Sequence, residues 1–325
     1  KTVLLDTVDK SVSERFFENI DFVLSGKPLD YVIINHMEPD HAATLGELVM
    51  RYPGVKIVGT SKTQRLIKQF FNKIDVEKAF LSVDESYSLD TGCHKLNFVY
   101  APMVHWPEVM VTYDSTTGTL FSADAFGTFG ALDGSIFADD ISIDNSFLSE
   151  ARRYYTNIVG KYGSSVVSLL KKASALDIKT VCPLHGPIFR KDIGLMIDKY
   201  MHWATYTPED SAVLIPYGTI YNNTENAACI LANELAKLGI TDVKLFDVSK
   251  THHSYIVSEA FRCSHIVFAS ATYNNGIFSG MEYLLRDLAE HNLSFRKVAV
   301  IENGSWNPKS GEKIKKLLSE MNGIT

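Results

Sequence analysis

The apolar positions in the first two hundred residues change period several times, which predicts a mixed α/β domain. Residues 2–6 and 31–34 are short apolar runs that predict buried strands, and apolar residues recur at helical spacing from near Ser13. The other predicted elements are a helix at 42–51, a strand at 55–58, a helix at 63–71 with Ser61 as N-cap, hairpins across 79–120, helical structure at 149–172 and a strand at 180–182. Hairpins with helices outside them predict an α/β sandwich.

After the polar segment 206–210 the pattern becomes a strict alternation of strands and helices. The strands are expected at 212–216, 243–247, 265–270 and 297–301, and the helices at 224–238, 254–262, 277–290 and 309–320. This alternation is typical of a doubly wound parallel sheet. We therefore expect two domains, residues 1–207 and 208–325. We also expect that N-terminal strands and a C-terminal strand and helix of these folds lie outside the sequence.

Composition and charge narrow the class of protein. The 325 residues are 46% hydrophobic and 22% charged, which is typical of globular domains with substantial cores. A net charge of −6 argues against nucleic acid as the partner, and no apolar run approaches the roughly 18 residues of a membrane span. The four cysteines form no C-x-x-C pair. This spacing excludes a rubredoxin-type or zinc-ribbon site and favours a reducing, cytoplasmic setting.

Metal-ligating residue types gather where predicted strands end. The segment 35–42 directly follows strand 31–34 and carries His36, Glu38, Asp40 and His41. Downstream, His105, Asp124 and His185 each follow an apolar run. A lone histidine is usually a packing or surface residue, but several such groups at successive strand ends would carry a large desolvation cost without a metal. Imidazole and carboxylate together suit first-row divalent metals, so the sequence predicts a metal site at one edge of the sandwich.

The strand at 212–216 leads into a polar segment with the features of a phosphate cradle. Its candidate residues are Thr219, Ile220, Tyr221, Asn222, Asn223 and Thr224. Threonine hydroxyls and the backbone N–H groups at a helix N-terminus can bind a phosphate dianion. A polar loop with a good N-cap is the alternative. Asn222 tolerates the left-handed conformation that such a turn requires.

Two further loops are expected at the carboxyl ends of neighbouring strands, where ligands bind in this architecture. They carry Ala271, Thr272, Tyr273, Asn274, Asn275 and Gly276 in one loop, and Gly304, Ser305 and Trp306 in the other. The sequence has no G-x-G-x-x-G with a distal acidic residue, so a dinucleotide is disfavoured. Both loops resemble the isoalloxazine loops of the flavodiiron flavodoxin domain, and this resemblance implies FMN as the ligand.

The pattern His-x-Glu-x-Asp-His at residues 36–41, followed by His105, Asp124 and His185, resembles the metal motif of the metallo-β-lactamase fold in its flavodiiron variant. In hydrolases of that fold the Glu38 position is normally a second histidine, and a carboxylate there favours iron over zinc. The resemblance covers essentially the whole chain. It implies an αββα sandwich followed by a flavodoxin-like doubly wound sheet. It also implies that His36, Glu38 and His105 hold one iron, that Asp40, His41 and His185 hold the other, and that Asp124 bridges them. Whether His41 coordinates stays open.

The same resemblance implies an FMN-dependent di-iron reductase of O₂ to water, of NO to N₂O, or both. Electrons would come from a separate donor, rubredoxin-like or other, and a head-to-tail homodimer, or a tetramer built from it, would bring one subunit's FMN to the other's irons. Tyr154 and Tyr155 are expected as polar groups beside the di-iron pocket, with simple packing as the alternative. Two other classes stay open: a zinc hydrolase fused to a flavodoxin, and an electron-transfer flavoprotein with an empty metal site.

Overall fold

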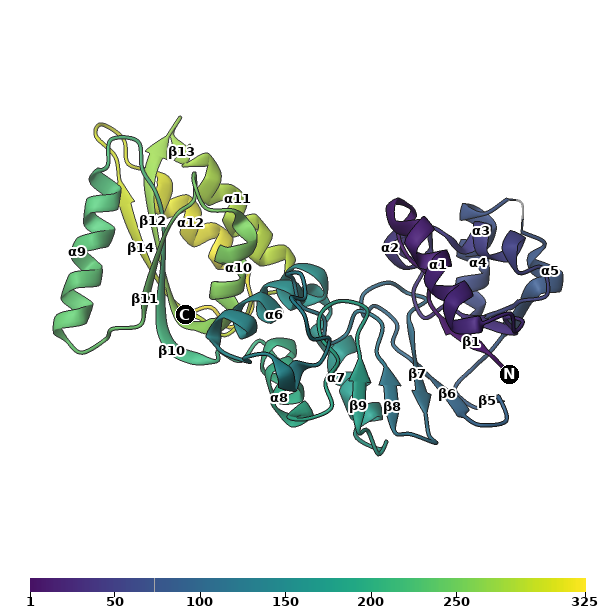
Figure 1. Ribbon diagram of the computed structural model, residues 1–325. Coiled ribbons are helices and arrows are strands. Elements are labelled where there is room, and N and C mark those ends of the chain that lie inside the picture. Colours follow the sequence, from purple (N-terminus) through teal and green to yellow (C-terminus); the bar gives the residue numbers. More distant parts are fainter. Residues whose placement is uncertain (73) are drawn as a thin grey trace. The chain divides into compact units, whose positions relative to one another are not determined.

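The computed structural model describes residues 1–72 and 74–325, which pack as two compact units (Figure 1). The first unit comprises Lys1–Asp144 and Ser165–Ile197, and the second comprises Asn145–Ser164 and Asp198–Thr325. Residues 145–164 and 198–207, which the sequence pattern assigns to the first domain, thus pack in the second unit. The domain boundary at residues 207 and 208 remains a sequence prediction.

The first unit contains a parallel sheet in the order β1-β2-β3-β4. Its strands are β1 (Val3–Leu5), β2 (Tyr31–Ile33), β3 (Lys56–Gly59) and β4 (Phe80–Ser82). The helices between them are α1 (Ser13–Leu24), α2 (Pro39–Ala42), α3 (Leu45–Arg51), α4 (Ser61–Phe70) and α5 (Val76–Ala79), with a 3-10 turn at Lys10–Val12. Helices are expected between these strands, because two neighbouring parallel strands must be joined by a crossover connection, which is usually helical.

A second sheet in the same unit has the order β5-β6-β7-β8-β9 and is antiparallel except for the last pair. Its strands are β5 (Ser88–Asp90), β6 (Lys95–Tyr100), β7 (Met110–Asp114), β8 (Thr119–Phe121) and β9 (Thr180–Cys182). A 3-10 turn at Ala138–Asp140 follows β8. Helix α7 (Gly163–Ala173) contacts this sheet, since Lys172 Nζ donates to the carbonyl of Tyr100 at 3.0 Å.

Alternation along the strands explains how the two sheets form one sandwich. Val32 and Ile34 pack with α1, α3 and α4 on the outer side of the first sheet. Ile33 faces the other way and packs with Phe98 and Met110 of the second sheet. Successive side chains of a strand point to opposite faces, so the unbroken apolar run at 31–34 is the signature of a strand buried on both sides. The predicted α/β sandwich is confirmed.

Local details differ from the sequence prediction. The helical stretch predicted at 149–172 consists of two helices, α6 (Asn145–Ile158) and α7, with a 3-10 turn at Gly160–Tyr162 between them. The N-cap of α4 is Thr60 rather than Ser61, and Thr60 and Thr63 form a reciprocal capping box. Helix α8 (Ile193–Ala204) was not expected from the pattern.

The second unit contains a parallel sheet in the order β11-β10-β12-β14, as predicted for a flavodoxin-like fold. Its strands are β10 (Asp210–Gly218), β11 (Val243–Asp247), β12 (Cys263–Tyr273) and β14 (Lys297–Asn303), with the short β13 (Gly276–Ile277) antiparallel to β12. The helices are α9 (Asn223–Lys237), α10 (His253–Arg262), α11 (Ser279–Glu290) and α12 (Ser310–Leu318). The strand order reverses at β10, so the carboxyl end of β10 is the topological switch point.

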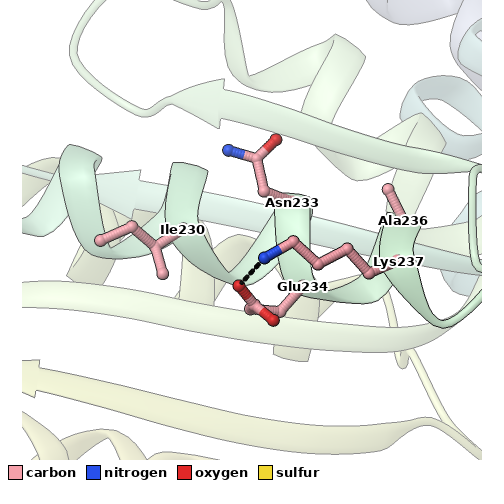
Figure 2. Close-up of a pocket in the computed structure, with 5 residues that line it drawn as sticks. All are labelled: Ile230, Asn233, Glu234, Ala236 and Lys237. Carbon is pink, nitrogen blue, oxygen red and sulfur yellow. Dashed lines mark hydrogen bonds and ion pairs between the residues drawn. The ribbon is translucent and has the colours of Figure 1, made fainter.

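Helices cover both faces of this sheet. Ala228 and Leu231 of α9 pack on Ile215 and Ala269, and α10, α11 and α12 lie on the opposite side (Figure 1). Figure 2 shows a hollow along α9, lined by Ile230, Asn233, Glu234, Ala236 and Lys237, in which Lys237 donates to Glu234 at 2.7 Å. None of the predicted site residues lines it. Among the described helices, none combines the length and the apolar character that crossing a membrane demands.

Candidate metal centre and phosphate cradle

The predicted metal ligands lie in four connections of the first unit. One connection follows β2 and includes α2, one joins β6 to β7, one follows β8 and one follows β9. In this order they carry His36, Glu38, Asp40 and His41, then His105, then Asp124, and then His185. The structure brings all of them into two neighbouring groups, so ligands from residues 36 to 185 meet at one edge of the sandwich.

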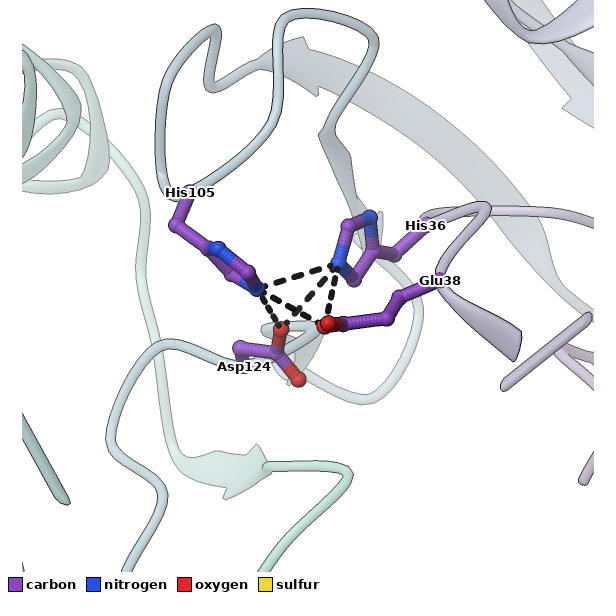
Figure 3. A group of neighbouring side chains, drawn as sticks. All are labelled: His36, Glu38, His105 and Asp124. Atoms are coloured by element: carbon purple, nitrogen blue, oxygen red, sulfur yellow. Dashed lines mark hydrogen bonds and ion pairs between the residues drawn. The ribbon is translucent and has the colours of Figure 1, made fainter. Parts of the chain in front are cut away.

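The first group consists of His36, Glu38, His105 and Asp124, whose side chains point toward one another (Figure 3). Glu38 Oε2 lies 3.3 Å from His36 Nε2 and 2.9 Å from His105 Nε2. Asp124 Oδ2 lies 3.3 and 3.2 Å from the same two nitrogens, which are themselves 3.3 Å apart. These four atoms lie within 4.8 Å of one another, so they are close enough together to bind one metal ion.

The second group consists of Asp40, His41 and His185. Asp40 Oδ2 lies 3.1 Å from His41 Nε2 and 3.2 Å from His185 Nε2, and these nitrogens are 3.1 Å apart. Asp124 Oδ1 lies 3.1 Å from His41 Nε2 and 3.5 Å from His185 Nε2. The two oxygens of Asp124 therefore face different groups, which is the position a bridging carboxylate needs.

Hydrogen bonds within the first sheet and between the two sheets hold these connections together. Buried Asp6 accepts hydrogen bonds from the backbone N–H of Asn35 at 2.7 Å and from its side-chain amide at 2.8 Å. The carbonyl of Asn35 accepts from Met110 N–H at 3.1 Å, and its side-chain oxygen accepts from the Thr112 hydroxyl at 2.7 Å. Asn35 thus joins the end of β2 to β7, directly before His36.

The site holds opposite charges close together in partly dry surroundings. Burial lowers the pKa of His41, but hydrogen bonds to Asp124 and Asp40 outweigh burial and raise it to about 10. Burial also lowers the pKa of His105, but hydrogen bonds to Asp124 and Glu38 outweigh it and raise this pKa to about 9. A hydrogen bond from His105 is the largest cause that lowers the pKa of Glu38, to about 2. Carboxylates that attract protons onto imidazoles this strongly would also attract a divalent cation, which displaces those protons when it binds.

A metal pair fits the groups that are present. Asp40 Oδ1 is buried without a hydrogen-bond partner. Within the described residues, the ion pairs of Glu38, Asp40 and Asp124 go to histidines, and those histidines are charged only when protonated. A buried polar atom without a partner costs about 1–3 kcal/mol, and metal coordination would remove that cost. The donor set is the imidazole and carboxylate mixture of first-row divalent metals.

Gly186 shows how closely the connections pack around His185. A Cβ atom at this position would lie 2.4 Å from Thr128 Cγ2, and the backbone has a φ of +85°. Both conditions require glycine. The sequence Leu-His-Gly therefore brings the His185 loop against the segment that follows Asp124.

The predicted phosphate cradle lies at the switch point of the second unit. Asn222 adopts the left-handed conformation with a φ of 62°, and α9 begins after it without a side-chain cap. The Thr219 hydroxyl oxygen is buried without a hydrogen-bond partner. The Thr224 hydroxyl accepts from the Asn303 amide at 3.2 Å, which links the α9 N-terminus to the end of β14. Uncapped N–H groups beside an unpaired hydroxyl fit a phosphate group.

The two other predicted loops lie at the ends of neighbouring strands. The β12–β14 register pairs Ala271 with Asn303, which places the segments 271–276 and 304–306 side by side. The first of them is the end of β12 and a turn into β13, with positive φ values at Asn274 and Asn275. The hydroxyl of Thr272 is already used, since it accepts from the backbone N–H of Lys309 at 3.0 Å.

Four aromatic and apolar side chains of the predicted cradle and the two loops are exposed. Tyr221 and Trp306 are 85% and 81% exposed, and Ile220 and Tyr273 are 49% and 48% exposed. Large apolar side chains in water at the ends of adjacent strands are available to cover a planar ring system.

Tyr154 and Tyr155 lie on α6, in the second unit. The Tyr155 ring packs at 5.0 Å from Tyr200 and 5.3 Å from Trp203, and its hydroxyl is buried without a hydrogen-bond partner. A role beside the di-iron pocket remains a prediction. Sequence reasoning missed Glu108, a buried carboxylate that touches His36, because a glutamate in a loop has no pattern to mark it.

Comparison with known proteins gives a consistent picture. The family model described as "ODP family beta lactamase" matches residues 1–186. The anaerobic nitric oxide reductase flavorubredoxin of Aeromonas hydrophila is 31% identical over 325 aligned residues, which cover 98% of this chain. The chain spans 64% of the length of that relative.

Solved structures agree with the sequence relatives. The flavodiiron protein of Giardia intestinalis has a TM-score of 0.91 and 25% identity, covering 98% of this chain and 77% of that protein. Rubredoxin oxygen:oxidoreductase of Desulfovibrio gigas has a TM-score of 0.91 and 27% identity, covering 99% and 80%. With the fold, the family model and full-chain relatives in agreement, this chain belongs to the flavodiiron protein family.

Proposed function

We propose that the chain is an FMN-dependent di-iron reductase that converts O₂ to water, NO to N₂O, or both. The observation that carries the proposal is the convergence of the two ligand groups with a glutamate at position 38. The names of the relatives, a nitric oxide reductase and an oxygen oxidoreductase, support the same reaction class.

In this proposal the first group holds one iron through His36, Glu38 and His105, and the second holds the other through Asp40, His41 and His185. Asp124 bridges them. An iron pair supplies binding positions for a diatomic gas and the electrons to reduce it. The candidate ligands differ in their exposure to solvent, and this difference indicates the side from which a substrate can reach the centre.

Access to the centre comes from the ligands that remain partly exposed. The Glu38, Asp40 and His185 side chains are 35%, 40% and 35% exposed, whereas His36 and Asp124 are 0% and 1% exposed. A small gas can therefore reach the two ligand groups from the side on which their exposed members lie. The buried ligands hold the geometry and exclude water from the opposite side.

For FMN, we propose that Thr219 and the N-terminus of α9 bind the phosphate. The predicted contacts of residues 271–276 and 304–306 with the ring system belong to the same proposal, as do the exposed Tyr221 and Trp306. Phosphate binding without a Lys or Arg is possible because helix N-terminal N–H groups carry partial positive charge.

The electron donor and the oligomer are also proposals. A separate donor, rubredoxin-like or other, would reduce FMN, and a head-to-tail homodimer, or a tetramer built from it, would bring FMN to the irons. A cytoplasmic location would suit the free cysteines, which include exposed Cys93 and Cys229.

The experiment that tests the function measures metal and flavin content of purified protein, and then mixes the reduced form anaerobically with O₂ or NO in a stopped-flow instrument. We expect iron and FMN in a ratio of about two to one, and flavin reoxidation by at least one gas. Zinc in place of iron, hydrolytic turnover and reoxidation that is unchanged in His105→Ala would contradict the proposal.

Thr219→Val is expected to weaken FMN binding about tenfold, because it removes a buried hydroxyl worth about 1–1.5 kcal/mol while keeping its volume. Fluorescence titration of flavin-free protein with FMN measures this. Thr205→Val is the matched control, since the Thr205 hydroxyl donates to the Met201 carbonyl at the end of α8. Equal FMN affinity in wild type and Thr219→Val would remove Thr219 from the cradle.

A further inference from the structure

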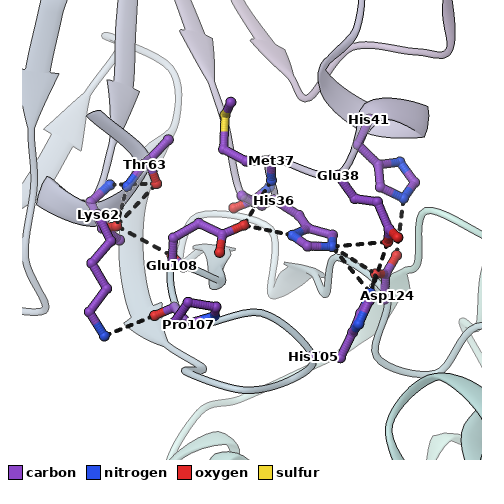
Figure 4. A network of polar contacts seen from close by, with 12 residues as sticks. His36, Met37, Glu38, His41, Lys62, Thr63, His105, Pro107, Glu108 and Asp124 are labelled. Carbon is purple, nitrogen blue, oxygen red and sulfur yellow. Dashed lines mark hydrogen bonds and ion pairs between the residues drawn. The ribbon is translucent and has the colours of Figure 1, made fainter. Parts of the chain in front are cut away.

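Glu108 is a buried carboxylate beside the metal centre that belongs to neither ligand group. Its Oε1 atom accepts hydrogen bonds from His36 Nδ1 at 2.8 Å and from the Met37 backbone N–H at 2.9 Å (Figure 4). The side chains of His36 and Glu108 are both 0% exposed. Because Glu108 Oε1 also accepts from the Met37 N–H, it is the acceptor in this pair, and His36 Nδ1 carries the proton. His36 Nε2, which faces Glu38, is then free to bind a metal.

The backbone around Glu108 ties the His105 loop to a rigid element. The Glu108 carbonyl accepts a hydrogen bond from the Thr60 hydroxyl at 3.3 Å, and the preceding carbonyl accepts from Lys62 Nζ at 3.1 Å. Thr60 caps α4, so both bonds attach the loop to the start of that helix. Through its side chain Glu108 holds His36, and through its backbone it holds the loop that carries His105. One residue therefore sets how far apart these two ligands lie.

The second carboxylate oxygen of Glu108 shows that stability alone does not explain the residue. Glu108 Oε2 is buried without a hydrogen-bond partner. An unpaired buried acceptor destabilises a fold by about 1–3 kcal/mol. The presence of a carboxylate at position 108 is better explained by its contact with the His36 imidazole, because a carboxylate partner makes a metal-binding histidine more basic.

We propose that Glu108 is a positioning residue for the first metal site. It fixes the tautomer and ring orientation of His36, increases the basicity of Nε2, and sets the spacing of His36 and His105. The Asp40, His41 and His185 group, which Glu108 does not touch, serves as an internal reference. The inference rests on the proposed metal centre and concerns its metal affinity, so it can be tested without any reductase activity.

The test uses Co²⁺ as a probe of metal-free protein. Wild type, Glu108→Gln and Glu108→Asp are titrated, and the visible absorption of bound Co²⁺ is followed together with metal content after gel filtration. We expect about two Co²⁺ per wild-type chain. In Glu108→Gln, which keeps an acceptor but loses the charge, the first site should bind about 10–100-fold more weakly with a changed spectrum, while the second keeps its affinity. Glu108→Asp keeps the charge and should restore part of the loss.

Asp6→Asn is the matched control. Asp6 is also a buried carboxylate of this region and accepts from the backbone N–H of His36 at 3.2 Å, but it has no hydrogen bond to the imidazole ring. A purely structural role for Glu108 would give Glu108→Gln and Asp6→Asn the same loss at both sites, and this result would overturn the inference. Unchanged affinities in Glu108→Gln would also overturn it while leaving the metal centre in place. A wild-type chain that binds no Co²⁺ would overturn the metal centre and this inference together.

Discussion

Asp124→Asn is expected to remove metal from both ligand groups at once, which no other single ligand substitution should do. The Asp124 side chain is 1% exposed, and its two oxygens lie 3.1–3.3 Å from His36, His41 and His105. Asparagine keeps the shape but loses the charge and replaces one acceptor by a donor. We expect a fall in affinity at both sites beyond the about 10–100-fold that loss of an outer partner causes. Iron content after dialysis and the rate of gas consumption measure it.

Asp114→Asn provides the control for this change. Asp114 is likewise a buried aspartate that binds a histidine, since its Oδ2 lies 2.7 Å from His94 Nδ1, but it belongs to neither ligand group. It should lose stability and keep its metal. Retention of both metals by Asp124→Asn would show that the carboxylate does not bridge, and the Asp40 and Glu38 carboxylates would then have to provide the anionic ligands alone.

The convergence of the candidate metal ligands could be predicted from the sequence because each of them follows a strand. The pairing of the strands brings their ends to one edge of the sheet. Residues that follow these ends therefore converge even when they are far apart in sequence, and the residue type is the only local feature that marks them. Asp6 and Asn35 could not be found in this way. Their hydrogen bonds join residues 29 positions apart, and an aspartate after a strand looks the same whether it meets solvent or a backbone amide.

Two details of the fold are not predicted from the sequence, and the physical reasons differ. The break between α6 and α7 depends on tertiary packing, because a Cβ atom at Gly163 would lie 2.2 Å from the Ala204 carbonyl oxygen. The turn from β12 to β13 has positive φ values at Asn274 and Asn275, followed by a glycine. This combination is typical of a two-residue hairpin. This hairpin is not predicted from the sequence, and the assignment of residues 271–276 to a ligand loop remains a prediction.

Arg296 is the largest fully buried charged side chain, and within residues 1–72 and 74–325 it forms no ion pair with an acidic side chain. Its guanidinium, 1% exposed, donates to the carbonyls of Ala260 at 2.9 Å and of Phe261, Tyr206 and Ser294 at 2.6 Å. Helix α10 ends at residue 262 and β12 begins at residue 263, so no loop residues are available to satisfy the last carbonyls of the helix. Burial lowers the pKa of Arg296 to about 10, which leaves it protonated at neutral pH.

Arg296→Met is therefore expected to lower the free energy of unfolding of the second unit by at least about 3 kcal/mol. Methionine fills the volume but leaves several buried carbonyls without donors, each at a cost of about 1–3 kcal/mol. Arg296→Lys keeps a charge and three N–H donors, so it should lose less. Urea unfolding of flavin-free protein, followed by circular dichroism, separates the two variants. A loss below about 1 kcal/mol in Arg296→Met would mean that water reaches these carbonyls, and that the end of α10 is held by its packing against β12 rather than by the guanidinium.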